Sequence, residues 1–293
     1  MGRRLTAIDV CSGAGGWACA ARGLPIDIVA AIDVDMLALR TYKLNHPDTD
    51  CICADVRQFD FRRFGHVDLV LGGIPCEEIS QARSRRPASV DTMNAWQRLL
   101  DACLAVPGAV GARWWCYEDV IQVQRYLPPR TPCRILNSRA WSAQNRRRAY
   151  VGSFPALPIG TDRRVLRSCL RPGPYRVTPG ILRGRPMRAD HYSHSGGFYP
   201  WTPGRKSPCA RPLPSRRDKE AAVVDGALRR QVEWQELATL QGFPPDYVFV
   251  GSPTHVHTLV GQAVQIDTAL AILEAICTEA LIDPNPVHPV HPC

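Results

Sequence analysis

The sequence predicts an α/β fold with two unequal lobes, and three features of its 293 residues carry that prediction. The first half alternates strand-like and helix-like runs, which is typical of a doubly wound sheet. After Phe154 the chain is crowded with Arg, Pro and Gly and has few long apolar runs up to about Arg230. Apolar periodicity then returns at Trp234. We therefore expect a large lobe containing the sheet and a small basic lobe inserted into it.

Five apolar runs have the length and composition of buried strands. They are Leu5 to Val10, Ile28 to Asp33, Val67 to Leu71, Arg113 to Glu118 and Ala149 to Gly152. Helix-like runs lie between and after them, at Met36 to Leu44, Thr92 to Val106, Trp234 to Gly242 and Val264 to Ile276. The order of these runs along the chain predicts a doubly wound sheet that is completed by C-terminal helices.

Composition narrows the class of protein. With 45% apolar residues, no apolar run as long as a membrane span and an N-terminus without a signal-peptide core, we expect a soluble cytoplasmic protein. The 12 cysteines are scattered without an even spacing, which favours reduced thiols. A net charge of +9 indicates a polyanionic partner.

A cysteine follows the third expected strand. In the segment GGIPCEEIS, Gly72 to Ser80, Cys76 lies just past an apolar run, where open α/β sheets bind ligands. The two glycines allow a sharp turn and Pro75 fixes one backbone dihedral, so the thiol would be held in a defined place. Cys76 is therefore a candidate nucleophile. The alternative is an inert buried cysteine in a turn.

Other polar residues follow the neighbouring strands. The segment DVCSGAGGW, Asp9 to Trp17, joins a strand to a helix through a glycine turn whose amides could cradle a cofactor. Asp33 ends the second strand, where an acidic residue can bind the ribose hydroxyls of a nucleotide-like cofactor. Asp55 ends the next segment of the chain. Each acid could instead cap a helix. Glu118 ends an apolar strand, so its carboxyl must be paired or functional.

These segments together resemble the DNA (cytosine-5) methyltransferases. The resemblance rests on an ordered set that spans most of the chain: DVCSGAGGW, Asp33, Asp55, GGIPCEEIS, Tyr117-Glu118-Asp119-Val120, Gln144 to Arg148, LQGFPPDY (Leu240 to Tyr247) and GQAV (Gly261 to Val264). The length of the segment from Glu118 to Arg148 is closer to that of the compact de novo-type or phage members of this family. The resemblance implies a Rossmann-like S-adenosylmethionine-dependent methyltransferase sheet with a second, smaller target-recognition domain.

The resemblance also implies the reaction. Cys76 would attack carbon 6 of a flipped-out cytosine in DNA, which makes carbon 5 able to take a methyl group. Glu118 would contact ring nitrogen 3 and the exocyclic amine. Arg146 and Arg148 would hold the base carbonyl and a phosphate and would favour the thiolate of Cys76.

By the same resemblance the cofactor is S-adenosylmethionine, with Asp33 on the ribose and Asp55 on the adenine amine. The full set of expected cofactor residues is Asp9, Gly13, Gly15, Gly16, Trp17, Asp33, Val34, Asp55, Pro75, Gln262 and Val264. The chain departs from the family pattern at five positions. The family usually has Phe where this chain has Cys11, and an aromatic residue where it has Val34. It usually has Gln in place of Glu77, and Asn in place of both Asp119 and Gln262. The loss of two aromatic residues predicts weaker packing on adenine and leaves a modified donor open.

The basic segment from Pro155 to Arg230 occupies the position of the target-recognition region. Its arginines, interleaved with aromatic residues, could contact phosphates or read guanine. We expect a catalytic domain of residues 1–153 plus 257–293 and a recognition domain of 154–256. The expected partner of this segment is double-stranded DNA, and a loop from Glu77 to Asp91, with Arg83, Arg85 and Arg86, could close over the flipped-out base. The resemblance also implies a bacterial or phage-infected cell, and we expect a monomer.

Three alternatives stay open. The same chemistry could act on tRNA, since one branch of the family uses that substrate. A catalytically silent nucleic-acid-binding module would not need Cys76, Glu118, Arg146 and Arg148 together. A small-molecule methyltransferase would leave the basic segment unexplained. No metal site is expected, because His288, His291 and Cys293 lie in a proline-rich tail.

Overall fold

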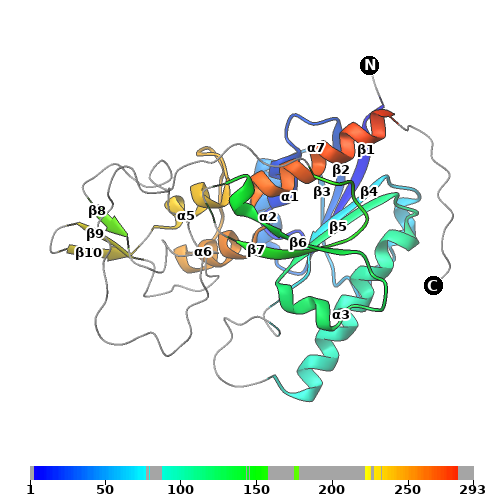
Figure 1. Ribbon diagram of the computed structural model, residues 1–293, viewed down its shortest axis with the longest axis horizontal. Coiled ribbons are helices and arrows are strands. Elements are labelled where there is room, and N and C mark those ends of the chain that lie inside the picture. Colours follow the sequence, from blue (N-terminus) through cyan, green and yellow to red (C-terminus); the bar gives the residue numbers. More distant parts are fainter. Residues whose placement is uncertain are drawn as a thin grey trace.

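The computed structural model describes residues 3–76, 79, 88–142, 144, 146–157, 175–177, 222–225, 228–231 and 233–282. Its main feature is a seven-stranded sheet with the strand order β3-β2-β1-β4-β5-β7-β6, with helices on both sides (Figure 1). The α/β fold class predicted from the sequence is confirmed.

The strand order of the sheet reverses at β1. Its strands are β1 (Leu5–Val10), β2 (Ile26–Asp33), β3 (Asp50–Cys53), β4 (Leu69–Gly73), β5 (Trp114–Asp119), β6 (Cys133–Asn137) and β7 (Arg147–Val151). The chain runs outward from β1 through β2 to β3 and then returns to place β4 on the other side of β1. Strands β1 to β5 pair in parallel, and β7 is antiparallel to both β5 and β6. The crevice outside the carboxyl ends of β1 and β4 is therefore the expected ligand site of such a sheet.

Alternate residues of the central strands supply two hydrophobic cores. The helices are α1 (Gly16–Ala21), α2 (Met36–Asn45), α3 (Val90–Ala109), α5 (Trp234–Gln241), α6 (Pro253–Gln262) and α7 (Ile266–Ile282). Leu5 and Ala7 of β1 pack with residues of α1 and α7, whereas Ile8 and Val10 pack with residues of α3. Figure 1 shows α7 and α3 on opposite sides of the sheet, which agrees with the two-residue period of a strand.

Side chains fix where the helices begin. The carboxylate of Asp35 accepts hydrogen bonds from the backbone amides of Leu37 and Ala38 at the start of α2. Ser89 and Ser252 act in the same way at α3 and α6. Helix α5 begins with a reciprocal capping box, since Glu233 and Glu236 each accept the other's backbone amide.

The five predicted strands agree with the structure to within two residues, but strands β3 and β6 were not predicted and the C-terminal helices differ. The segment GQAV was expected to begin the last helix at Val264. Instead α6 ends at Gln262, and α7 runs from Ile266 to Ile282, so GQAV is the break between two helices. Helix α6 was missed because its apolar residues are interrupted by Thr254, His255 and His257.

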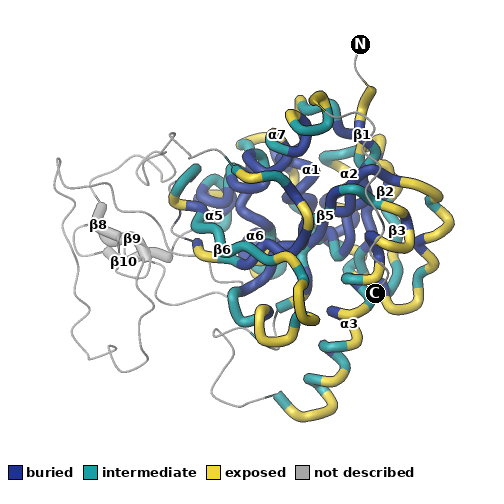
Figure 2. Tube along the Cα trace, turned by 45° about the vertical axis from the view of Figure 1, so that its right-hand side comes forward, coloured by how far each residue is buried: buried dark blue, intermediate teal, exposed yellow. Residues whose placement is uncertain are grey.

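The packed unit around the sheet includes the chain before residue 257. Leu237, Leu240, Phe243, Tyr247 and Val256 belong to the same buried cluster as α1 and α7. The expected domain boundary at residue 257 thus falls inside α6. Figure 2 shows the central strands buried and the N-terminal end of α3 exposed, where the Glu77 to Asp91 segment ends.

The described part of the basic segment is a three-stranded antiparallel sheet in the order β10-β9-β8. Its strands are β8 (Tyr175–Val177), β9 (Ala222–Asp225) and β10 (Leu228–Gln231). The remaining predictions for residues 158–232, and those for most of the Glu77 to Asp91 loop, lie outside the described residues. Within the described chain no single helix could cross a membrane, although α6 and α7 taken as a bent pair are long and apolar enough.

Candidate active site

The predicted polar residues lie at one edge of the sheet. In the parallel register, Asp9 of β1 is opposite Ala31 of β2 and Leu71 of β4. Gly73 of β4 is opposite Glu118 of β5. Because the carboxyl ends of parallel strands share an edge, the glycine turn after β1, Asp33, Cys76 and Glu118 all border the crevice at the switch point.

The turn between β1 and α1 needs unusual backbone angles. Cys11, Gly13 and Gly15 all have positive φ, at 52°, 53° and 86°. A Cβ on Gly15 would lie 2.8 Å from the hydroxyl of Tyr247, whereas a Cβ on Gly13 would meet no atom within 4 Å. Gly15 is thus required for packing, and Gly13 leaves open space beside the turn where a ligand could approach the backbone.

Asp33 is tied to this turn. One of its carboxylate oxygens accepts the backbone amide of Gly13 at 2.8 Å, and the other accepts the amide of Asp35 at 2.9 Å. Burial raises the pKa of Asp33, and the two amide hydrogen bonds oppose that rise. The predicted ribose residue and the predicted glycine turn are therefore one hydrogen-bonded unit.

Two buried polar atoms near the turn have no hydrogen-bond partner in the described part of the chain. The hydroxyl of Tyr42 donates to one oxygen of Asp9 at 3.2 Å, but the other oxygen of Asp9 has no partner among the described residues. The Ser12 hydroxyl is also buried and unpartnered there. Burial raises the pKa of Asp9 well above its usual value. Unsatisfied buried polar atoms are expected where a ligand completes the hydrogen bonding.

Asp55 and Val34, the two residues expected to contact adenine, have surroundings that complicate that role. Asp55 forms a 2.5 Å ion pair with Arg57, whose hydrogen bonds hold the pKa of Asp55 below its usual value. Val34 is 67% exposed at the end of β2. Asp55 would have to share its carboxylate between Arg57 and a ligand, and Val34 offers a small apolar contact where an aromatic ring was expected.

Three contacts hold the turn that carries Cys76. Ile74 donates its backbone amide to the carbonyl of Glu118 at 3.2 Å. The carbonyl of Pro75 accepts the indole N–H of Trp96 at 2.7 Å, and the carbonyl of Gly72 accepts that of Trp17 at 2.9 Å. Trp17, predicted as a cofactor residue, is thus buried against the base of this turn.

The electrostatic surroundings of Cys76 are mixed. Its half-buried thiol has a pKa raised to about 12, mainly by burial and then by the carboxylates of Asp119 and Glu118. Arg148 and Arg146 act in the opposite direction. The two arginines therefore favour the thiolate, but burial outweighs them.

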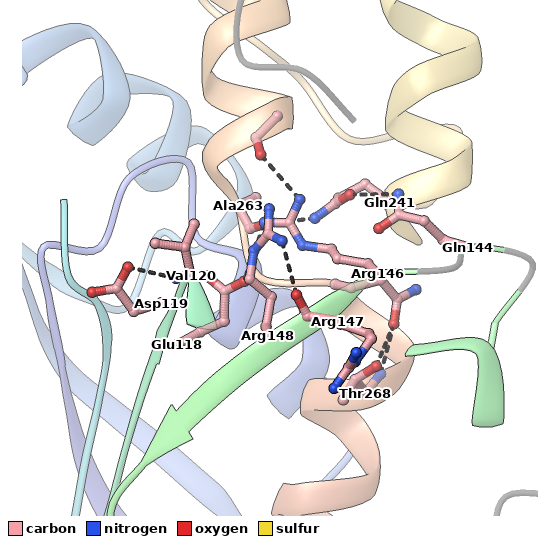
Figure 3. Close-up of polar contacts among 12 residues, drawn as sticks. Glu118, Asp119, Val120, Gln144, Arg146, Arg147, Arg148, Gln241, Ala263 and Thr268 are labelled. Carbon is pink, nitrogen blue, oxygen red and sulfur yellow. Dashed lines mark hydrogen bonds and ion pairs between the residues drawn. The ribbon is translucent and has the colours of Figure 1, made fainter. Parts of the chain in front are cut away.

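Glu118, Arg146 and Arg148 form a buried ionic cluster (Figure 3). Nη2 of Arg146 and Nε of Arg148 each lie 3.1 Å from the same oxygen of Glu118. Arg146 also donates to the carbonyls of Gly261 and Ala263, at 3.3 and 3.2 Å. The C-terminal break between α6 and α7 thereby anchors the guanidinium group beside Glu118.

The remaining predicted residues lie around that break. Val264 is buried, and a Cβ on Gly16 would lie 3.0 Å from its Cγ1, so the two residues pack directly together. Gln262 is exposed at the end of α6. Their expected roles toward a cofactor stay predictions.

Sequence reasoning gave no role to several residues that the fold brings into the site. They are Tyr42, Asp119, Gln144, Gln241 and Tyr247. Tyr247 donates its hydroxyl to the Ala14 carbonyl of the glycine turn at 2.5 Å, across 233 positions of sequence. Such contacts carry no local pattern. For Gln144, Gln241 and Tyr247 the signal was their membership of the ordered motifs.

Comparisons with known proteins point to one family. The sequence profile described as "C-5 cytosine-specific DNA methylase" matches residues 5–96 and 183–278. The type II methyltransferase M.HgiDI of Herpetosiphon aurantiacus is 24% identical over 305 aligned residues, covering 93% of this chain and 94% of that protein. The type II methyltransferase M.NgoMIV of Neisseria gonorrhoeae is 37% identical over 79 residues, 27% of this chain and 25% of that one.

Solved structures support the fold. The S. pombe Dnmt2 methyltransferase aligns over 95% of this chain and 99% of its own, with a TM-score of 0.59 at 16% identity. A putative DNA modification methyltransferase from an E. coli prophage gives a TM-score of 0.64 at 14% identity, with the same coverage. At these identities the likeness concerns the fold alone.

Proposed function

Because the chain belongs to the C-5 cytosine-specific DNA methylase family, we propose that it transfers a methyl group from S-adenosylmethionine to carbon 5 of cytosine in double-stranded DNA, through a covalent bond between Cys76 and the base. One arrangement carries this proposal: the turn bearing Cys76 is hydrogen-bonded to the strand end bearing Glu118, and Glu118 is paired with Arg146 and Arg148. We propose that the protein acts in the cytoplasm.

Cys76 is the proposed nucleophile. Carbon 5 of cytosine is a poor nucleophile, and attack of a thiolate on carbon 6 turns the ring into an enamine that can accept an electrophile at carbon 5. After transfer, loss of the carbon 5 proton and release of the Cys76 sulfur restore the aromatic ring. In a stacked duplex carbon 6 is not accessible, so the base must be flipped out of the helix.

Glu118 and the two arginines would stabilise the base during attack. Addition at carbon 6 makes ring nitrogen 3 more basic, and a carboxyl at that atom can supply a proton or hydrogen bond. In the free protein Glu118 is occupied by Arg146 and Arg148. Both contacts are to the same oxygen of Glu118, so the base could meet its other oxygen, and the guanidinium groups could meet the base carbonyl or a phosphate.

The residues at the β1 and β2 ends fit S-adenosylmethionine, the methyl donor that this family uses. The open space at Gly13 and the unpartnered Asp9 oxygen and Ser12 hydroxyl are groups that a polar ligand would satisfy. Asp33 would hold the ribose and the backbone from Gly13 to Gly16 would hold the methionine part, with Gln262 and Val264 nearby. When bound, the donor supplies an electrophilic methyl group on a sulfonium sulfur.

Residues 158–232 are the proposed target-recognition domain, and the rest of the chain is the proposed catalytic domain. The second boundary is placed before α5 because α5 packs in the core of the large sheet. The proposed DNA partner is favoured by the basic composition of the inserted segment.

The test is a transfer assay with labelled S-adenosylmethionine. Duplex DNA of mixed sequence and unmodified tRNA are supplied separately, and the labelled product is digested to nucleosides. The proposal expects label in 5-methylcytosine from DNA. Label only in tRNA would support the same chemistry on the other substrate, and DNA binding without transfer would indicate a silent binding module.

A further inference from the structure

Two buried amide side chains lie beside the ionic cluster without a part in the reaction described above. Gln241 is the last residue of α5, and Gln144 lies two positions before Arg146. Both side chains are completely buried, with 0% exposure. Buried amides are costly unless their hydrogen bonds are satisfied, and the Gln144 side-chain oxygen has no partner among the described residues, so the contacts that the two amides do make need an explanation.

The contacts of Gln241 lead to Arg146 (Figure 3). The carbonyl oxygen of the Gln241 side chain accepts a hydrogen bond from the Gln144 amide at 3.1 Å. The Gln241 amide donates to the carbonyl of Ala263 at 2.5 Å. That same carbonyl accepts Nη2 of Arg146 at 3.2 Å, and Nη2 also contacts Glu118 at 3.1 Å.

The Ala263 carbonyl is therefore shared by an amide and a guanidinium group. A carbonyl oxygen has two lone pairs, so both donors can be satisfied at once only while the carbonyl keeps its direction. Ala263 lies in the break between α6 and α7, where no backbone amide of the described residues donates to its carbonyl. Gln241 supplies the missing constraint, and through it sets the position of Arg146 relative to Glu118.

Helix α5 also adjoins the proposed recognition domain. Residues 158–232 end where the capping box of Glu233 and Glu236 begins α5, and Glu236 is itself buried. Leu237 and Leu240 pack α5 into the main core, so strain at Glu233 would act on Gln241 through small shifts of this helix. The chain thus connects the recognition segment to Arg146 by one helix and one amide.

We propose that Gln241 is a positioning residue that couples the recognition domain to the orientation of Arg146. The inference rests on the proposed function, and it assigns part of the sequence discrimination to the chemical step. DNA that fits the recognition domain leaves α5, and so Arg146, correctly placed. DNA that fits badly displaces α5 and loosens the Gln241 contact before Arg146 can meet the base.

The test compares Gln241→Met, which keeps the length of the side chain and removes both hydrogen bonds, with Gln235→Met, the same change at an exposed position of α5. Single-turnover methylation is measured on the preferred DNA site and on a site with one base changed. Gln241→Met should slow methylation of the preferred site by about tenfold or more, the scale of a misplaced catalytic group, with DNA affinity unchanged. The ratio of rates between the two sites should fall, and Gln235→Met should resemble the wild type in both.

Gln144→Met provides an independent variant of the same hydrogen bond. If the two amides act together, the double variant Gln144→Met/Gln241→Met should be slower than Gln241→Met by no more than about twofold. Equal slowing of both DNA sites with an unchanged ratio, or additive effects in the double variant, would overturn the inference. Absence of methylation by the wild-type protein would instead refute the proposed function.

Discussion

Nη2 of Arg146 lies 3.1 Å from a carboxylate oxygen of Glu118, and both side chains are almost completely buried. Arg148 contacts the same oxygen at the same distance, so one carboxylate faces two guanidinium groups. Removing one member of a buried ionic cluster leaves charge without compensation, which is costly. This cluster is therefore the place where a single substitution should have the clearest effect.

Glu118→Gln should lower turnover by about a hundredfold or more, the scale of a lost acid or base group, while DNA affinity changes little. The reason is that the Glu118 carboxyl would contact the base ring and not the phosphates. Single-turnover rates and equilibrium DNA binding measure the two effects separately. Glu279→Gln is the matched control, because Glu279 pairs with Arg113 at 3.5 Å and is 43% exposed. Parallel losses of rate and DNA affinity in Glu118→Gln would indicate a structural role.

Cys76 should form a covalent adduct with DNA that contains 5-fluorocytosine at the target position. With S-adenosylmethionine present, methyl transfer leaves both a methyl group and fluorine on carbon 5. Fluorine cannot leave as a proton does, so the Cys76 sulfur is not released and its bond to carbon 6 should survive denaturation. Cys76→Ser should give no adduct, and Cys53→Ser, which removes an exposed thiol, should give the wild-type amount. Denaturing gel electrophoresis of the labelled DNA measures the adduct. An adduct that persists in Cys76→Ser would assign the nucleophile elsewhere.

The charges around Cys76 should control its reactivity in the DNA-free protein. Its pKa is about 12, so between pH 7 and 10 the small thiolate fraction rises tenfold per pH unit. Asp119 raises this pKa and Arg148 lowers it. Asp119→Asn should therefore speed alkylation of Cys76 by iodoacetamide across this range, and Arg148→Gln should slow it. Cys76→Ser supplies the background of the other thiols, and shifts of the same sign in both variants would contradict the assignment.

Val34 should limit cofactor affinity. Its side chain is 67% exposed next to Asp33, so an aromatic residue there could stack on an adenine ring. Val34→Phe should lower the Kd for S-adenosylmethionine by about fivefold or more, given the usual strength of stacking on a base. Val29→Phe, a similar change at another partly exposed position of β2, should not change it. Isothermal titration calorimetry gives both constants, and an unchanged Kd in Val34→Phe would remove Val34 from the proposed site.

The sequence predicted the residues at the strand ends better than the contacts that hold them in place. Strand ends such as Asp33 and Glu118 carry a local signal, because a charged residue that terminates an apolar run is unusual. The contact of Gln144 with Gln241 spans 97 positions and has no such signal. The Asp55 ion pair was also hidden, since a residue two positions away can contact a carboxylate or point elsewhere. The ordered motifs indicated that these residues mattered, and the tertiary contacts supply the reason.

The exchange of residues 158–232 for the matching region of a related enzyme should move the methylated DNA sequence and keep the Cys76 chemistry. This boundary retains α5, so the contacts of Gln241 with Gln144 and Ala263 are preserved. Sequencing DNA from cells that express the chimera, after a conversion that marks 5-methylcytosine, identifies the site. A second chimera that exchanges 158–241 is the matched control and should be slower, because a foreign α5 must rebuild those contacts. Within 158–232, neutralising an arginine that contacts only phosphate should weaken binding to all sequences and lower the salt slope by about one unit, whereas losing a base-reading arginine should relax one position by about 1–3 kcal/mol. If the first chimera is active yet methylates the original site, recognition must lie outside the exchanged segment, and the Glu77 to Asp91 loop becomes the segment to exchange next.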